Sequence, residues 1–238
     1  MLGVRVGVPE EFADWFADLA DDAEQPHVGQ LSGQATGSDP LAVLTSATLL
    51  AVEHSELLCM HAGVVAGQNG LVVLPGVSGL GKTTLVAALV QSGFGYVSDE
   101  ALAIDRAKLG VESFARPLAL SAASCDLLGL DFSATDSAGA EMLVRPSELG
   151  RISSIRASDV PATNVNEIVL AQRGPGATSL RPGRRGEAVV ELLTRSFNSF
   201  RQPTDSFHAI VETVRNARVW RACYSDAREL AELMRARF

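Results

Sequence analysis

The stretch "LPGVSGLGKTTL", Leu74 to Leu85, decides the fold class of this 238-residue chain. From Gly76 to Thr83 it satisfies the pattern G-x-x-x-x-G-K-[ST], with an apolar strand-like run before it and an apolar helix-like run after it. Glycines let the backbone turn tightly, so that successive N–H groups converge on phosphate oxygens at the positive end of the following helix. The pattern and its context together predict a phosphate-binding loop in an α/β fold.

Individual positions of this loop have expected tasks. Lys82 adds a compact cation beside the phosphates, and the Thr83 hydroxyl is placed to bind a Mg²⁺ that bridges the terminal phosphates. The alternatives are a glycine-rich turn without a ligand and a binder that has lost its chemistry. The predicted phosphate-binding residues are Gly76, Val77, Ser78, Gly79, Leu80, Gly81, Lys82, Thr83 and Thr84.

The segments on either side of the loop indicate alternating strands and helices. From Leu58 onwards, two β-rich apolar runs surround a turn that contains Asn69-Gly70, which is typical of a hairpin. After the loop, a helix is expected to end at Gly93, and "YVSDEALAI" is an apolar segment interrupted by two acids. Strand, loop, helix and strand together predict an α/β core.

The chain is expected to divide near residue 57. Residues 1–57 are predicted to form a small helical N-terminal cap, with one helix over 9–24 and a second that starts at Asp39-Pro40 and runs to about Leu57. Residues 58–238 are predicted to form the P-loop domain. Its further predicted strands are 114–121, 166–174 and 219–225, its predicted helices are 121–129, 186–200, 205–217 and 225–237, and its arginine-rich segment 173–188 is predicted to be a mobile loop.

Composition excludes several classes of partner. A formal net charge of −8 argues against a nucleic-acid surface, which would need a surplus of Lys and Arg. No run reaches the roughly 18 apolar residues of a membrane span, and "MLGVRVGVPEEF" lacks the apolar centre of a signal peptide. The three cysteines show neither a disulfide framework nor metal-ligand spacing. We therefore expect a cytoplasmic protein without membrane or nucleic-acid partners, as a monomer or a homo-oligomer.

Phosphoryl transfer also needs a group that positions the attacking oxygen and accepts its proton, and the adjacent acids Asp99 and Glu100 are the candidates. Two carboxylates in an apolar stretch are costly to bury without a metal or a hydrogen-bonding partner. Because neighbouring side chains on a strand point to opposite faces, only one of the pair is expected to face the phosphate. The alternative to a catalytic role for the two acids is a plain surface turn. His61 lies among apolar residues on the predicted strand before the hairpin, and by itself it could equally be a buried core histidine.

The order and spacing of these segments resemble a known family. "HAGVV", an apolar hairpin, "LPGVSGLGKTTL", a helix ending in Gly, "YVSDEALAI" and "FARPLALS" follow one another over roughly Leu58 to Arg116. This arrangement resembles the C-terminal catalytic domain of HPr kinase/phosphorylase and its shorter HPr-kinase-like relatives. The resemblance implies the P-loop fold variant shared with phosphoenolpyruvate carboxykinase, in which a mixed sheet lies between helices.

The same resemblance implies roles for individual residues. The loop glycines, Lys82 and Thr83 would bind the phosphates of ATP and Mg²⁺, with Lys82 also a catalytic residue, and Asp99 would be the catalytic base and a further metal residue. His61 would assist near the transferred phosphate, and Glu100 would be a metal partner. Arginines supply the candidate contacts to the substrate, which are Arg116 in "RPLAL" and Arg181, Arg184 and Arg185 in the arginine-rich segment.

The chain departs from that family in three respects. Asp99-Glu100 and Val77-Ser78 stand where an Asp-Asp pair and an Asp-Ser pair are usual, and a separate N-terminal domain has no counterpart in the first 57 residues. These departures argue against HPr as the substrate. We therefore expect an ATP- and Mg²⁺-dependent kinase of a hydroxyl, on a serine of a peptide or protein. The alternatives are a kinase of a small-molecule alcohol and a nucleotide-binding regulatory ATPase module.

Overall fold

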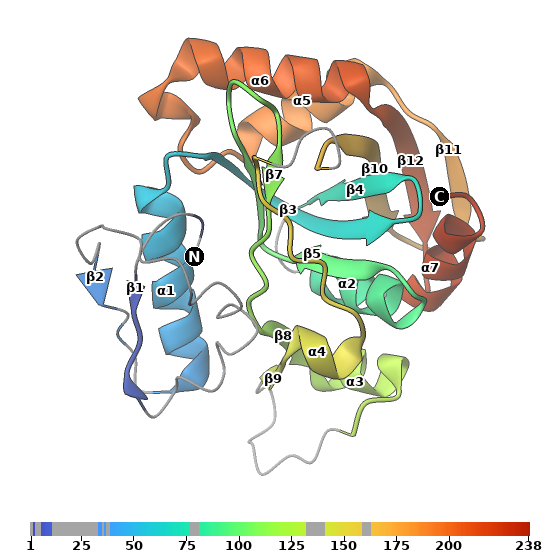
Figure 1. The fold of residues 1–238 in the computed structure, drawn as a ribbon. Coiled ribbons are helices and arrows are strands. Elements are labelled where there is room, and N and C mark those ends of the chain that lie inside the picture. Colours follow the sequence, from blue (N-terminus) through green and yellow to red (C-terminus); the bar gives the residue numbers. More distant parts are fainter. Residues whose placement is uncertain are drawn as a thin grey trace.

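Helices flank both faces of one mixed β-sheet (Figure 1). The computed structural model describes residues 2, 6–10, 33–34, 36, 39–76, 81–131, 141–158 and 163–238. Among these residues, none of the helices has the length and apolar character needed to cross a membrane. The predicted α/β class with a mixed sheet between helices is confirmed, and the HPr-kinase type remains a prediction.

The main sheet has eight strands. Seven of them lie in the order β11-β12-β10-β4-β3-β6-β7, and β5 pairs with β3. Two short ladders, β1-β2 and β8-β9, lie outside this sheet. The strands are β1 Val6–Gly7, β2 Gly33–Gln34, β3 Leu58–Gly67, β4 Gly70–Pro75, β5 Gly95–Ser98, β6 Ala101–Ile104, β7 Val111–Glu112, β8 Leu118–Ser121, β9 Glu141–Val144, β10 Val165–Arg173, β11 Ser179–Pro182 and β12 Arg218–Tyr224.

The predicted hairpin is confirmed. β3 and β4 pair antiparallel up to the Gly67↔Gly70 pair. Gly70 has a φ of 123°, and a Cβ at this position would lie 2.1 Å from Asn166 Oδ1, so a larger residue would be strained there. β4, β10 and β12 are parallel neighbours. Their carboxyl ends therefore lie at one edge of the sheet, which is where open α/β sheets bind ligands.

Helices cover both faces of the sheet, and each face has its own hydrophobic core. α2 and α7 pack on one face, where Leu85, Leu89 and Met234 are buried, and α5 and α6 pack on the other, where Leu192 and Ile210 are buried (Figure 1). A fully buried leucine contributes about 2 kcal/mol, so this packing holds α2 firmly against the sheet. The helices are α1 Pro40–His54, α2 Lys82–Gln91, α3 Ala122–Leu128, α4 Pro146–Leu149, α5 Arg185–Thr194, the 3₁₀ helix η2 Ser199–Arg201, α6 Pro203–Asn216 and α7 Ala227–Arg235.

α1 begins where the sequence predicts it. Asp39 Oδ1 accepts a hydrogen bond from Ala42 N at 2.9 Å, and Pro40 occupies the first turn. The helix ends at His54 instead of near Leu57, and its Ala51 lies in a small core that β3 and β6 also line. α1 is thereby anchored to the sheet. Of the helix predicted over 9–24, only residues 9 and 10 are described, so this prediction lies almost wholly outside the described residues.

The arginine-rich segment 173–188 contains regular structure, which corrects the prediction of a mobile loop. Ser179–Pro182 form β11, paired antiparallel with β12 at the edge of the sheet, and α5 starts at Arg185. An edge strand needs partners on one side only, so it tolerates a proline and a polar composition that hide it from sequence patterns. Leu180 packs against the core on the α2 side. The helix predicted over 186–200 ends at Thr194.

Candidate functional site

The start of α2 is arranged to receive an anion. Gly81 precedes the helix in the left-handed conformation, with a φ of 82°, and it has no side chain to cap the helix. The first N–H groups of a helix lack carbonyl partners within it and carry the positive end of the helix dipole. Gly81 and the start of α2, which form the C-terminal end of the predicted loop, are therefore suited to bind a phosphate. Its remaining residues Val77, Ser78, Gly79 and Leu80 lie outside the described residues.

A cleft of about 540 Å³, called here the phosphate cleft, opens at this helix start. It brings together three segments that the sequence predicts as functional, namely Gly81 to Thr84, Glu100 and Arg116. Arg173, the first residue of the arginine-rich segment, also lines it, although it was not among the individual arginines predicted to contact substrate. Its place at the end of an apolar strand is a usable signal. The wall formed by α1 consists of Leu41, Thr45, Thr48 and Leu49.

The two acids lie where the strand opposite β3 is interrupted. β5 and β6 both pair antiparallel with β3, and Asp99 and Glu100 form the gap between them. The Val64↔Ser98 pair continues the register of β6, and the register of β5 shifts between Val64 and Val65. Ala62 N donates to the carbonyl oxygen of Glu100 at 3.2 Å, which fixes the backbone of the gap. His61 is the β3 partner of Ala101. The register thereby brings His61 next to the acids, as the predicted site requires.

Glu100 is the acid that lines the phosphate cleft. Its Oε1 lies 3.0 Å from His61 Nδ1, and its Oε2 lies 3.3 Å from Arg116 Nη2. Burial alone would raise the pKa of the Glu100 carboxyl, but the hydrogen bond with His61 and the positive charge of Arg116 outweigh burial and lower this pKa to about 2. Glu100 is therefore an ionised carboxylate at neutral pH, held in place from two sides.

Asp99 lies beneath this surface. Its side chain has no exposed area, and its Oδ1 accepts hydrogen bonds from the Tyr96 hydroxyl at 3.0 Å and from Arg116 Nε at 3.1 Å. Its Oδ2 is buried and has no hydrogen-bond partner among the described residues. The alternation expected for adjacent acids is thus present, with Glu100 as the acid that faces the cleft. The role of Asp99 as the catalytic base stays a prediction.

Arg116 joins these groups into one cluster. Its guanidinium contacts both acids, and its Nη1 donates to Thr48 Oγ1 of α1 at 3.1 Å. Arg116 is 8% exposed, so it is mainly the counter-ion of two carboxylates while still lining the phosphate cleft. Thr48 and Tyr96 were not predicted. Nothing in the sequence indicates Thr48, because its contact depends on how α1 packs.

Lys82 connects the helix start to the acids. It is 9% exposed, and its Nζ donates a hydrogen bond to the carbonyl oxygen of Asp99. Burial lowers the pKa of the Lys82 ammonium below its ordinary value, although the charges of Asp99 and Glu100 act to raise it. The lysine thus lies between the phosphate cleft and the acids, which is the position that a phosphate-binding cation requires.

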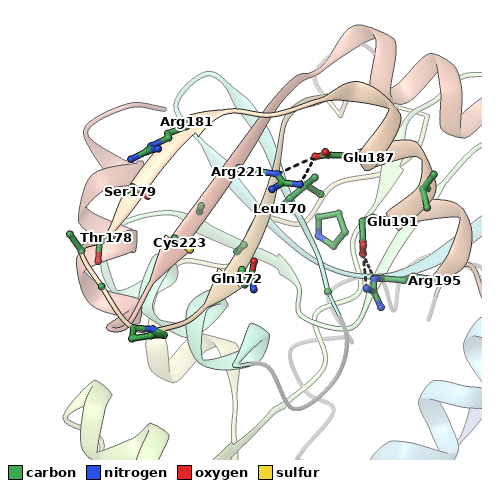
Figure 2. A pocket seen from close by; sticks show the side chains of 18 of the residues that line it. Leu170, Gln172, Thr178, Ser179, Arg181, Glu187, Glu191, Arg195, Arg221 and Cys223 are labelled. Atoms are coloured by element: carbon green, nitrogen blue, oxygen red, sulfur yellow. Dashed lines mark hydrogen bonds and ion pairs between the residues drawn. The ribbon is translucent and has the colours of Figure 1, made fainter.

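A second cleft of about 1140 Å³ lies on the α5 side of the sheet (Figure 2). It is lined by Pro75 and Gly76, by the ends of β10, β11 and β12, and by α5; we call it the second cleft. Of the arginines predicted to contact substrate, Arg181 lines this cleft and Arg184 lines a small pocket beside it. Arg185 is the first residue of α5 and lines neither cleft as described.

The phosphate cleft fits the cofactors that the resemblance implies. The helix start, Lys82 and Arg173 offer N–H groups and positive charge to polyphosphate, and Thr83 and Glu100 offer oxygen ligands in the same cleft. Among the described residues, no three His, Cys, Asp or Glu side chains form a metal-binding group. Magnesium usually needs only one or two carboxylates together with substrate phosphates, so the residues present are compatible with it.

No protein-family description matches the chain, and a search of curated proteins found no similar sequence. Any functional conclusion therefore depends on the residues and geometry of the clefts.

The low pKa of Glu100 predicts acid-sensitive stability. A carboxyl whose pKa falls from an ordinary 4.5 to about 2 on folding stabilises the protein above pH 4.5, and this contribution is lost as the pH falls through 2. The free energy of unfolding, measured with urea at pH 4.5 and at pH 2, is therefore expected to fall less for Glu100→Gln than for the wild type. Parallel pH profiles for the two proteins would contradict the His61 and Arg116 contacts.

Proposed function

We propose that the protein is an ATP- and Mg²⁺-dependent kinase that transfers a phosphoryl group to a hydroxyl, on a serine of a peptide or protein. The observation that carries this proposal is the meeting of an uncapped helix start, Lys82 and Glu100 in one cleft. Phosphoryl transfer depends mainly on positioning and on charge stabilisation, and these groups supply both. The surrounding cluster of His61 and Arg116 keeps Glu100 ionised and fixed.

Each group has a task in this proposal. When bound, ATP–Mg²⁺ would supply the phosphoryl group, whose phosphorus bonds to the acceptor oxygen as its bond to the bridging oxygen breaks and ADP leaves. Lys82 and the first N–H groups of α2 would hold the phosphates. The Thr83 hydroxyl and Glu100 would hold the metal, since a carboxylate with a pKa of about 2 is a weak proton acceptor.

Asp99 is the proposed acceptor of the hydroxyl proton. Asp99 precedes the cleft-lining Glu100 in the sequence and is buried beneath the cleft. Arg116 contacts its Oδ1, and Lys82 donates a hydrogen bond to its backbone carbonyl oxygen. Its Oδ2 lacks a partner among the described residues, which leaves this oxygen able to take a proton. Since Asp99 has no exposed area, its side chain or the groups that cover it must move before the carboxylate reaches the acceptor. Catalytic hydrogen bonds often tighten only when substrate is bound.

Consumption of ATP, measured with and without a hydroxyl acceptor, tests this function. A kinase consumes ATP quickly only when a serine-containing acceptor is present, because the attacking oxygen must come from the acceptor. Rapid consumption that is independent of any acceptor would instead support a regulatory ATPase module. Failure of calorimetry to detect ATP binding in the presence of Mg²⁺ would contradict both functions.

A further inference from the structure

The second cleft offers a place for the acceptor, and its position relative to the phosphate-binding loop is the first reason. Gly76, the first glycine of the loop, lines the second cleft, whereas Gly81, the last, lines the phosphate cleft. Arg195, which also lines the second cleft, accepts a hydrogen bond at its carbonyl oxygen from His61 N at 2.8 Å. One end of the second cleft therefore lies beside both the loop and the histidine of the site.

The size of the second cleft distinguishes between kinds of acceptor. Sites for small molecules usually enclose about 300–1,000 Å³, and the volume here is about 1140 Å³ in a groove that lies between α5 and the sheet. A free alcohol such as serine would leave most of this space unfilled. An extended segment of a peptide, with side chains on both sides of its backbone, makes better use of it.

The charges of the second cleft are unevenly balanced. Glu187 and Arg221 form an ion pair of 2.9 Å, and Glu191 and Arg195 form another of 2.6 Å (Figure 2). Arg181, on β11, also lines the cleft, and its side chain has no ion-pair or hydrogen-bond partner among the described residues. The cross-strand partner of Arg181 in the β11-β12 ladder is Arg221. The β11 side of the second cleft therefore carries uncompensated positive charge, which favours an acidic ligand group.

From these observations, and on the basis of the proposed kinase function, we infer that the second cleft binds the acceptor as an extended peptide segment. The acceptor hydroxyl lies at the end formed by Gly76, beside the phosphate-binding loop. An acidic side chain, several residues away in the peptide, pairs with Arg181. Arg181 is thus a determinant of specificity, and it is not part of the machinery that binds ATP.

Two matched peptide libraries test this inference. Each peptide has one serine among glycines and alanines, and carries either one Glu or one Lys at a varied distance from the serine. The wild type is expected to phosphorylate the best Glu peptide with a kcat/KM about 10-fold above its Lys counterpart, the usual scale of one charge-assisted contact. Arg181→Glu should reverse this preference with no change in the KM for ATP.

Arg215→Glu is the matched control, because Arg215 is an exposed arginine of α6 that pairs with Glu212 outside the second cleft. It makes the same change in net charge and should leave the peptide preference of the wild type intact. An unchanged preference in Arg181→Glu, with transfer intact, would overturn the inference alone. Phosphorylation of free serine in preference to both libraries would also overturn it. Absence of ATP binding would overturn the proposed function itself.

Cys223 provides a second measurement that does not depend on activity. It lies on the floor of the second cleft and is exposed, whereas Cys59 and Cys125 are buried (Figure 2). Alkylation by iodoacetamide in the native protein is therefore expected at Cys223. The best Glu peptide should slow this alkylation in the wild type but not in Arg181→Glu. Equal protection by Glu and Lys peptides would contradict the proposed contact.

Discussion

Replacement of Lys82 by alanine is expected to lower the rate of phosphoryl transfer by at least about 100-fold, the usual cost of removing one preorganised electrostatic contact from a transition state. The substitution removes a buried cation from the phosphate cleft and leaves the N–H groups of α2 in place. Affinity for ATP should fall as well, because the lysine also contacts the phosphates of the ground state. Steady-state kinetics and calorimetric titration with ATP and Mg²⁺ measure the two effects separately.

Lys108→Ala is the control for this experiment. Lys108 is the second of the two lysines in the chain, and it is exposed in the turn that follows β6. Its replacement should change neither the turnover nor the affinity for ATP. Thermal unfolding of Lys82→Ala must show a folded protein, since Lys82 also donates to the Asp99 carbonyl. Near-normal turnover in a folded Lys82→Ala protein would show that the phosphate cleft is not the site of transfer.

Asp99→Asn is expected to lower turnover by roughly 10²–10⁴-fold, the usual scale for a lost general base. Asparagine has nearly the same shape, and its carbonyl oxygen can still accept hydrogen bonds from Tyr96 and Arg116. Affinity for ATP–Mg²⁺ should therefore remain within a few-fold of the wild type. The pair Asp99→Asn and Glu100→Gln separates the two acids, because the Glu100 variant should mainly raise the concentration of Mg²⁺ needed for activity.

The outcomes of these two substitutions assign the acids. If Asp99→Asn abolished nucleotide binding in a folded protein, the carboxylate would be a metal ligand and not the base. If its turnover survived while that of Glu100→Gln collapsed, the carboxylate that faces the cleft would carry the chemistry. Survival of turnover in both variants would contradict a carboxylate mechanism altogether.

Local patterns predicted the elements that hold the candidate site. The glycine spacing placed the start of α2, and the Asn69-Gly70 turn placed the hairpin that leads into it. Strand alternation predicted that only one of two adjacent acids would face the phosphate. Identifying Glu100 as that acid required the register of β3 against β5 and β6, because the register sets which side chain the interrupted strand turns toward the cleft.

Features that depend on distant segments could not be predicted in this way. The Arg116–Thr48 hydrogen bond joins residues 68 positions apart, and the two clefts are lined by several separate segments each. β11 was missed because an edge strand needs no strong alternation once one neighbour supplies its hydrogen bonds. Because β11 was not predicted, the second cleft was not predicted either. Arg181 lines this cleft from β11, where its cross-strand neighbour is Arg221.

The fate of the γ-phosphorus of ATP tests the central claim most directly. Phosphorus NMR can follow it in a mixture of the protein, ATP, Mg²⁺ and a serine peptide with an acidic residue. The kinase function predicts that the γ-phosphate signal is replaced by that of a phosphate monoester, together with ADP, and that Lys82→Ala prevents this conversion. Appearance of inorganic phosphate alone, with the peptide unmodified, would contradict transfer to a hydroxyl.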